Sequence, residues 1–242
     1  MSITIERAPK RWRRAVGQAA RGIFTTKVLL TCGIAYGVLY VVANDVVAAT
    51  IFDGYSRVDQ AISELSGTDA ASRPFLNAIL PLFTLVVIGF GTGVWKAAQQ
   101  SRALRVTGAI LVVQGIMFPL WLLFPMTSRA QMVQETTAAN DVGHLILGAV
   151  AILFIIAEMG FSAAAFGKRF RLFSVAMAVT VLVFGAVTGM LSSDITAGHP
   201  TPWIGIVERI SYGAWLLWMG VLAVVLLRTQ RPRQAQSRVP GR

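Results

Sequence analysis

Asp141 and His144 have the spacing that best fits acid–base chemistry in this chain. They lie three residues apart in the segment NDVGH, at the start of a long apolar run, so in a helix their side chains can touch. A carboxylate that holds an imidazole in place suits a general base or a metal ligand. The structural alternative is that Asp141 is a favourable anion at a helix N-terminus and that His144 faces the membrane interface.

Asp45 is a second candidate, because it lies about two turns inside the end of another apolar run, beside Asn44. An ionised carboxylate at that depth costs about 3 kcal/mol on insertion scales. We therefore expect Asp45 to face the interior of a helix bundle and to find a partner there. The candidate partners are Arg209, Arg57 and Arg73. Asp45 is then either an anchor for a substrate or ion, or one half of an interhelical pair.

Glu208 and Arg209 open the last apolar run, in the segment VERISYGAW. Because they are adjacent, they point in different directions on a helix. Glu208 aligns with Ser211 and Tyr212, whereas Arg209 can reach Asp45 or a lipid phosphate. The alternative is that this segment only anchors the helix at the membrane edge through its aromatic side chains.

Two further chemistries have weaker support in the sequence. Ser63 could act as a nucleophile if its segment folded over His144, but no Gly-x-Ser-x-Gly elbow is present and Ser63 could equally bond a helix end. Asp141, His144, Asp194 and His199 could together bind a divalent metal such as zinc, and the two histidines could ligate a haem. No HxxxH or HExxH spacing supports such a site, so we predict no metal and specify no cofactor.

The composition places these residues in a membrane protein. The chain is 55% hydrophobic and 14% charged, with a mean hydropathy of +0.64, whereas soluble domains are about 25% charged. Apolar runs that cross a bilayer must be helical, because lipid satisfies no backbone hydrogen bond. We predict an all-α bundle within residues 28–228, between a basic arm (1–27) and a basic tail (229–242). The six predicted transmembrane helices cover residues 28–52, 74–96, 106–125, 141–166, 172–192 and 207–228.

Charge is distributed unevenly between the two ends of the predicted bundle. The net charge is +11, and basic residues dominate both termini and the second and fourth connections. The positive-inside rule therefore places both termini in the cytoplasm of a multi-pass protein of the cell (inner) membrane. We expect membrane lipids and possibly a membrane protein as partners, and no nucleic acid. The other end carries both histidines and most acidic residues, namely Asp45, Asp53, Asp59, Glu64, Asp69, Glu135, Asp141, Asp194 and Glu208.

The first extracytoplasmic loop, over residues 53–73, predicts a short amphipathic helix. Val58, Ile62 and Leu65 recur at helical spacing, and Gly67 is well placed to end the helix. We expect this helix to lie in the outer membrane interface.

Within the membrane, the sequence predicts close packing between helices of the same chain. Pro119 should kink the third helix, because it lacks a backbone N–H, and Gln114 in the same helix should bond a neighbouring helix. Small residues that recur four apart let helix backbones approach each other. These pairs are Gly33 and Gly37, Gly89 and Gly93, and Gly185 and Gly189.

Several short motifs together resemble one family. The matching residues are Tyr55, Ser63, Glu64 and Leu65 after the first helix, Asn77 near the start of the second, Phe124 and Pro125 at the end of the third, His144 at the start of the fourth, and Glu208, Arg209 and Ile210 at the start of the sixth. Over about residues 28–228 the chain resembles the bacterial and archaeal integral-membrane family catalogued as domain of unknown function 998. The resemblance implies a six-helix membrane protein and supplies no established reaction.

We therefore predict a polar site, open to the extracytoplasmic leaflet, that binds or processes a lipid or another amphiphilic head group. Asp141, His144 and Ser63 would be its catalytic groups, and whether the protein is an enzyme is left open. The alternatives are a non-catalytic scaffold or subunit of a larger complex, and a small transporter. The substrate-binding residues would be Asp45, Asn77, Asp194, Glu208 and Arg209, with Arg209 holding an anionic group.

Overall fold

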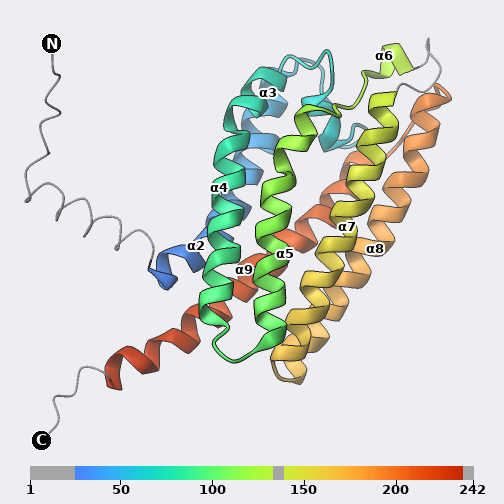
Figure 1. Ribbon diagram of the computed structural model, residues 1–242. Coiled ribbons are helices and arrows are strands. Elements are labelled where there is room, and N and C mark those ends of the chain that lie inside the picture. The colour runs from blue at the N-terminus through green and yellow to red at the C-terminus, as the bar shows by residue number, and fades with distance from the viewer. Residues whose placement is uncertain (1–24, 133–138, 237–242) are drawn as a thin grey trace, which may run out of the picture.

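The computed structural model describes residues 25–132 and 139–236, and every regular element within them is a helix (Figure 1). The basic arm up to residue 24, Glu135 and the last six residues lie outside the described part. In chain order the elements are α2 (Thr26–Val41), the π-helix η1 (Val42–Ala48), α3 (Ala49–Ile51), the 3-10 helix η2 (Ile62–Ser66), α4 (Arg73–Ala97), α5 (Arg102–Met117), the 3-10 helix η3 (Phe118–Leu122), α6 (Arg129–Met132), α7 (Ala139–Ala165), α8 (Lys168–Thr196) and α9 (Ile204–Gln236).

Six helical segments of the described chain are long and apolar enough to cross a membrane, which confirms the predicted six-helix membrane fold. They coincide with the predicted spans to within a few residues. The segments are Thr26–Ile51, Arg73–Ala97, Arg102–Leu122, Asn140–Ala165, Lys168–Thr196 and Ile204–Thr229. Large apolar side chains stay exposed on their outer faces, such as Leu85, Leu153 and Met190. Those faces suit lipid, so the chain is a multi-pass membrane protein.

The six spans form a closed ring. Each packs against the next span along the chain, and α9 packs against α2 to close the ring. Consecutive spans run in opposite directions, so the connections alternate between two ends (Figure 1). We call the end that carries η2 and α6 the cap end; the first residue of α2 and the last of α9 lie at the opposite end. The predicted acidic end is the cap end, and its extracytoplasmic orientation stays a prediction from charge.

Glycines allow close approach between neighbouring spans, as predicted. A Cβ added to Gly93 would lie 2.9 Å from backbone atoms of Leu29 and Leu30 in α2, and one on Gly33 would lie 2.6 Å from the Phe90 ring in α4. A Cβ on Gly185 in α8 would meet Ile152 of α7 at 3.0 Å. These contacts are intramolecular, which confirms the packing role predicted for Gly33, Gly93 and Gly185. It is not confirmed for Gly189, where an added Cβ would meet nothing within 4 Å.

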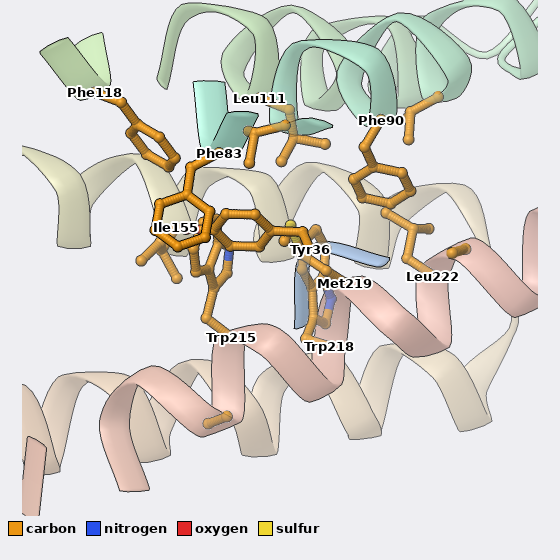
Figure 2. Close-up of a cluster of buried hydrophobic side chains, with 14 of the residues drawn as sticks. Tyr36, Phe83, Phe90, Leu111, Phe118, Ile155, Trp215, Trp218, Met219 and Leu222 are labelled. Carbon is orange, nitrogen blue, oxygen red and sulfur yellow. The ribbon is translucent and has the colours of Figure 1, made fainter. Parts of the chain in front are cut away.

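Buried aromatic and aliphatic side chains fill the interior of the ring (Figure 2). Trp215 and Trp218 of α9 are fully buried, and Trp215 packs edge-on against Tyr36 with ring centroids 5.6 Å apart. Tyr36 also contacts Phe83 and Phe118, at centroid distances of 5.7 and 6.0 Å. This cluster fills the middle of the ring.

Two spans are irregular on the cap-end side. The α-helix of the third span ends at Met117 and continues as the 3-10 helix η3, which contains Pro119. Proline cannot donate the next helical hydrogen bond, so the predicted kink is a change of helix type. In the first span the π-helix η1 contains Asn44 and Asp45, and the Asn44 amide donates to the Tyr40 carbonyl at 3.0 Å. Such π-helical turns are frequent at functional sites.

The predicted amphipathic helix of the first outer loop is wrong in both type and location. Only Ile62–Ser66 are helical, as a 3-10 turn, and Ile62 and Leu65 are buried against the bundle instead of facing lipid. Side chains satisfy the local N–H groups, because Glu64 accepts the Ala61 N–H at 2.8 Å, and this competes with α-helical bonding. The Gly67 N–H bonds the Glu64 carbonyl, as expected of a helix end. The segment therefore caps the ring.

Candidate functional site

A cavity of about 490 Å³ opens inside the ring on the cap-end side. Its size is typical of a site for a small organic ligand. Its apolar walls come from four spans and include Leu76, Leu80, Phe83, Phe118, Ile152, Ile155 and Val181. Its polar wall residues include Asn44, Ser63, Ser66, Arg73, Asn77, Gln114, Asp141, His144, Thr188, Ser192, Glu208 and Ser211. Polar side chains thus meet an apolar interior in one space.

His144 and Asp141 both line this cavity, but their hydrogen bonds go to the chain that ends the third span. The His144 Nδ1 lies 2.9 Å from the Phe124 carbonyl oxygen, which can only accept, so Nδ1 carries the proton and Nε2 is left with its lone pair. Asp141 is buried and its Oδ1 accepts the Thr127 N–H at 2.8 Å. The predicted orienting role of Asp141 is therefore filled by the Phe124 carbonyl and by the edge-on Trp121 ring, 4.8 Å away between centroids.

Ser63 and Glu208 line the cavity from the cap side. The Ser63 hydroxyl donates to the Met126 sulfur at 3.4 Å, so Ser63 and His144 flank the same segment, Phe124–Met126. Among the described contacts, Ser63 is not hydrogen-bonded to His144, and the nucleophile–base pair considered from the sequence is not formed. The Glu208 carboxylate accepts the backbone N–H of Ile62, which fixes η2 over the start of α9.

Asp45 and Arg209 are brought together, but outside the cavity wall. Their Oδ1 and Nε atoms are 2.7 Å apart, which confirms Arg209 as the partner of Asp45. Arg209 also donates to the carbonyls of Arg57 and Gly205 and to the Tyr55 hydroxyl. With its donors used in this way, Arg209 holds the first outer loop to α9 and is not placed to hold an anionic ligand.

Asp194 lies apart from the other predicted site residues. Its carboxylate is 3.6 Å from the His199 ring, and both side chains are largely in contact with solvent, at 43% and 67% exposure. Neither residue lines the cavity. Within residues 25–132 and 139–236, no three His, Cys, Asp or Glu side chains are arranged to hold a metal ion. The four-residue metal site considered from the sequence is therefore not assembled, because α7 and α8 hold the two His–Asp pairs apart.

Asn77 and Arg73 lie near the start of α4 and complete the polar wall. Asn77 is exposed, which places it at the rim. Arg73 is partly buried, and one of its N–H groups donates to the Thr68 carbonyl at 3.2 Å. Among the described lining residues, Arg73 is the only lysine or arginine. Sequence reasoning named Arg73 only as a partner for Asp45, although its place one turn before Asn77 was a signal for the site.

A second ion pair joins the loops of the cap. Arg129 contacts both carboxylate oxygens of Glu64, at 2.7 and 2.8 Å, and the Glu64 side chain is only 6% exposed. Arg129 also donates to Thr201 at 2.8 Å and to the Asp59 carbonyl at 2.9 Å. The loops before α4, α7 and α9 are thereby tied together. The sequence offered no signal for this role, because residues 126–140 carry no regular pattern.

Tyr55 gives the cap a measurable pH dependence. Its hydroxyl bonds the Ala61 carbonyl at 2.9 Å, and burial raises the pKa of this phenol from 10.0 to about 12, although Arg209 opposes the shift. The stability contributed by the neutral phenol is complete below pH 10 and is lost as the pH rises through about 12. The free energy of unfolding, measured across this pH range, should fall more steeply for the wild type than for Tyr55→Phe. Equal slopes would contradict the assignment.

This arrangement provides a binding wall with one free base. The Nε2 atom of His144 can accept a hydrogen bond or a proton from a ligand, and Arg73 can hold an anionic group. Asp141 and Glu208 are committed to backbone N–H groups. These hydrogen bonds therefore support recognition of a polar group at the rim.

Comparison with known proteins identifies a family and no activity. The family described as Protein of unknown function (DUF998) matches residues 34–225, which is most of the chain; the match contains four spans in full and most of the first and the last. No curated protein and no solved structure matches. The resemblance inferred from the short motifs is thus confirmed. The chain belongs to the family described as Protein of unknown function (DUF998).

Proposed function

We propose that this membrane protein binds a small amphiphile, with the polar head group of the ligand at the cavity rim and its hydrocarbon chain between the helices. The observation that carries the proposal is the continuity of the cavity from a polar rim to apolar walls. Arg73, Asn77 and His144 are on the polar side, and Phe83 and Ile155 are on the apolar side. An amphiphile matches both surfaces, whereas a purely polar solute would leave the walls unmatched.

The size and position of the cavity narrow this ligand further. A volume of about 490 Å³ fits one molecule of the size of a typical small-molecule ligand. In the predicted orientation the cap end faces the extracytoplasmic leaflet of the cell membrane, so the ligand would enter from that side. If the bound molecule is also processed, the Nε2 of His144 is the group placed to accept a proton from it.

A cavity-filling substitution tests this proposal. A Cβ on Gly148 of α7 would meet only the edge of Trp121, at 4.0 Å, so Gly148→Leu fills the cavity without disturbing a helix contact. Gly160 lies three turns along the same helix, is exposed, and has nothing within 4 Å, so Gly160→Leu is the matched control. Each protein would be purified, and its bound amphiphiles extracted and quantified by mass spectrometry.

We expect the wild type and Gly160→Leu to retain about one equivalent of a selected amphiphile, and Gly148→Leu to retain less by about tenfold, since occupied volume raises the cost of binding. Equal retention by all three proteins would show that the cavity is not the binding site. If the extracted lipids have the same composition as the bulk membrane, the result would favour the alternative that the protein is a non-catalytic scaffold.

A further inference from the structure

Gln114 lines the cavity and has a buried hydrogen-bonding group without a partner in the described chain. The residue is only 4% exposed, lies in the middle of the third span and lines the cavity. Its carbonyl oxygen has no hydrogen-bond partner among the described residues, so this oxygen does not make the interhelical bond expected from the sequence. A buried acceptor left without a donor is destabilising, because it has lost its hydrogen bonds to water and gained none in the protein.

The position of Gln114 is far from the polar rim. It precedes the end of η3 by eight residues, or about 15 Å along the helix axis, since α-helical residues rise about 1.5 Å and 3-10 residues about 2.0 Å. The side chains of Phe83, Phe118 and Leu80 also line the cavity and offer no donor. The hydroxyls of Tyr36 and Tyr212 are hydrogen-bonded to each other at 2.7 Å, and neither is bonded to the Gln114 carbonyl. The chain of an amphiphile bound at the rim would therefore pass a hydrogen-bond acceptor partway along its length.

We propose that the ligand is a hydroxylated amphiphile, with a hydroxyl group on its chain that donates to the Gln114 carbonyl. This inference rests on the proposed amphiphile binding and specifies which class of amphiphile the site binds. A hydroxyl is neutral, so it can lie within the membrane region without the cost of a charge. It also donates and accepts, which matches the two ends of a carboxamide. A plain hydrocarbon chain would leave the acceptor unsatisfied.

The experiment compares hexadecanoic acid with its isomers that carry one hydroxyl at successive mid-chain carbons. Binding to purified full-length protein would be measured by thermal stabilisation as a function of probe concentration. One mid-chain isomer should bind the wild type about tenfold more tightly than hexadecanoic acid, as expected when one buried acceptor gains its donor. Gln114→Leu should abolish this preference while it still binds the plain chain.

Thr84 provides the matched control. Its hydroxyl is also buried without a partner, but Thr84 does not line the cavity. Thr84→Val should keep the wild-type preference, and Gln114→Met serves as a second apolar variant if Gln114→Leu is poorly folded. Equal affinity of the wild type for all isomers would overturn the hydroxyl assignment, as would a preference that survives in both Gln114 variants. Failure of every probe to bind the wild type would instead count against amphiphile binding itself.

Discussion

Replacement of Arg129 by leucine should lower the free energy of unfolding by about 3 kcal/mol or more. The substitution leaves the Glu64 carboxylate buried, at 6% side-chain exposure, without its only salt-bridge partner in the described chain. Breaking a buried pair costs more than the pair itself contributes, because the remaining charge keeps its desolvation penalty. The bonds from Arg129 to Thr201 and to the Asp59 carbonyl are lost as well. The cap should then open before the spans separate.

Denaturant unfolding in a fixed detergent would measure the change for Arg129→Leu. Asp194→Ala is the matched control, because it removes one partner of an exposed pair at the same end; such pairs contribute about 1 kcal/mol or less. The double substitution Arg129→Leu with Glu64→Leu should recover part of the loss, since no charge is then left unpaired. A loss for Arg129→Leu no larger than for Asp194→Ala would show that this ion pair does not hold the cap.

The membrane fold was predictable because each span carries its own signal. Length, hydropathy and loop charge are local properties, and they located all six helices before any contact was known. Asp45 was predictable for a similar reason, because a carboxylate inside a span requires a partner and few arginines were within reach. Its pairing with Arg209 follows once α9 closes the ring against α2.

The cap was not predictable because its contacts join loops that are distant in the sequence. Arg129 meets Glu64 across 65 residues, and the loop that carries Arg129 shows no periodic pattern. The segment around Leu65 has helical spacing, yet it forms a 3-10 turn in which Ile62 and Leu65 are buried on the bundle. Tertiary burial thus overrode the local pattern.

For the candidate site too, local features were predictable from the sequence and long-range contacts were not. Local reasoning located His144, Asp141, Ser63 and Glu208 on the wall that they share. It assigned Arg209 to ligand binding, whereas in the structure the Arg209 guanidinium bonds Asp45, Tyr55 and two backbone carbonyls. It also expected Gln114 to be satisfied by a neighbour, which depends on side-chain positions across the ring. Predicting which polar groups remain free therefore required the hydrogen bonds themselves.

The last prediction concerns the contact that holds α2 against α4. Gly93→Leu should destabilise the protein by about 3 kcal/mol, at the upper end of overpacking effects. A Cβ at this position would lie 2.9 Å from the backbone of Leu29 and Leu30, which cannot rotate away as a side chain can. The two helices must therefore separate. Asn44 lines the cavity and belongs to the same span as Leu29, so it would shift with that span.

Gly220→Leu is the matched control, because Gly220 is also inside a membrane helix and has nothing within 4 Å of an added Cβ. Both substitutions gain the same helix propensity, about 1 kcal/mol, so the difference between them isolates crowding at the α2–α4 contact. Unfolding in detergent would measure stability, and retention of the bound amphiphile would report on the cavity. If Gly93→Leu is as stable as Gly220→Leu, α2 and α4 do not depend on close backbone packing, and the ring must be held by the cap and the aromatic core instead.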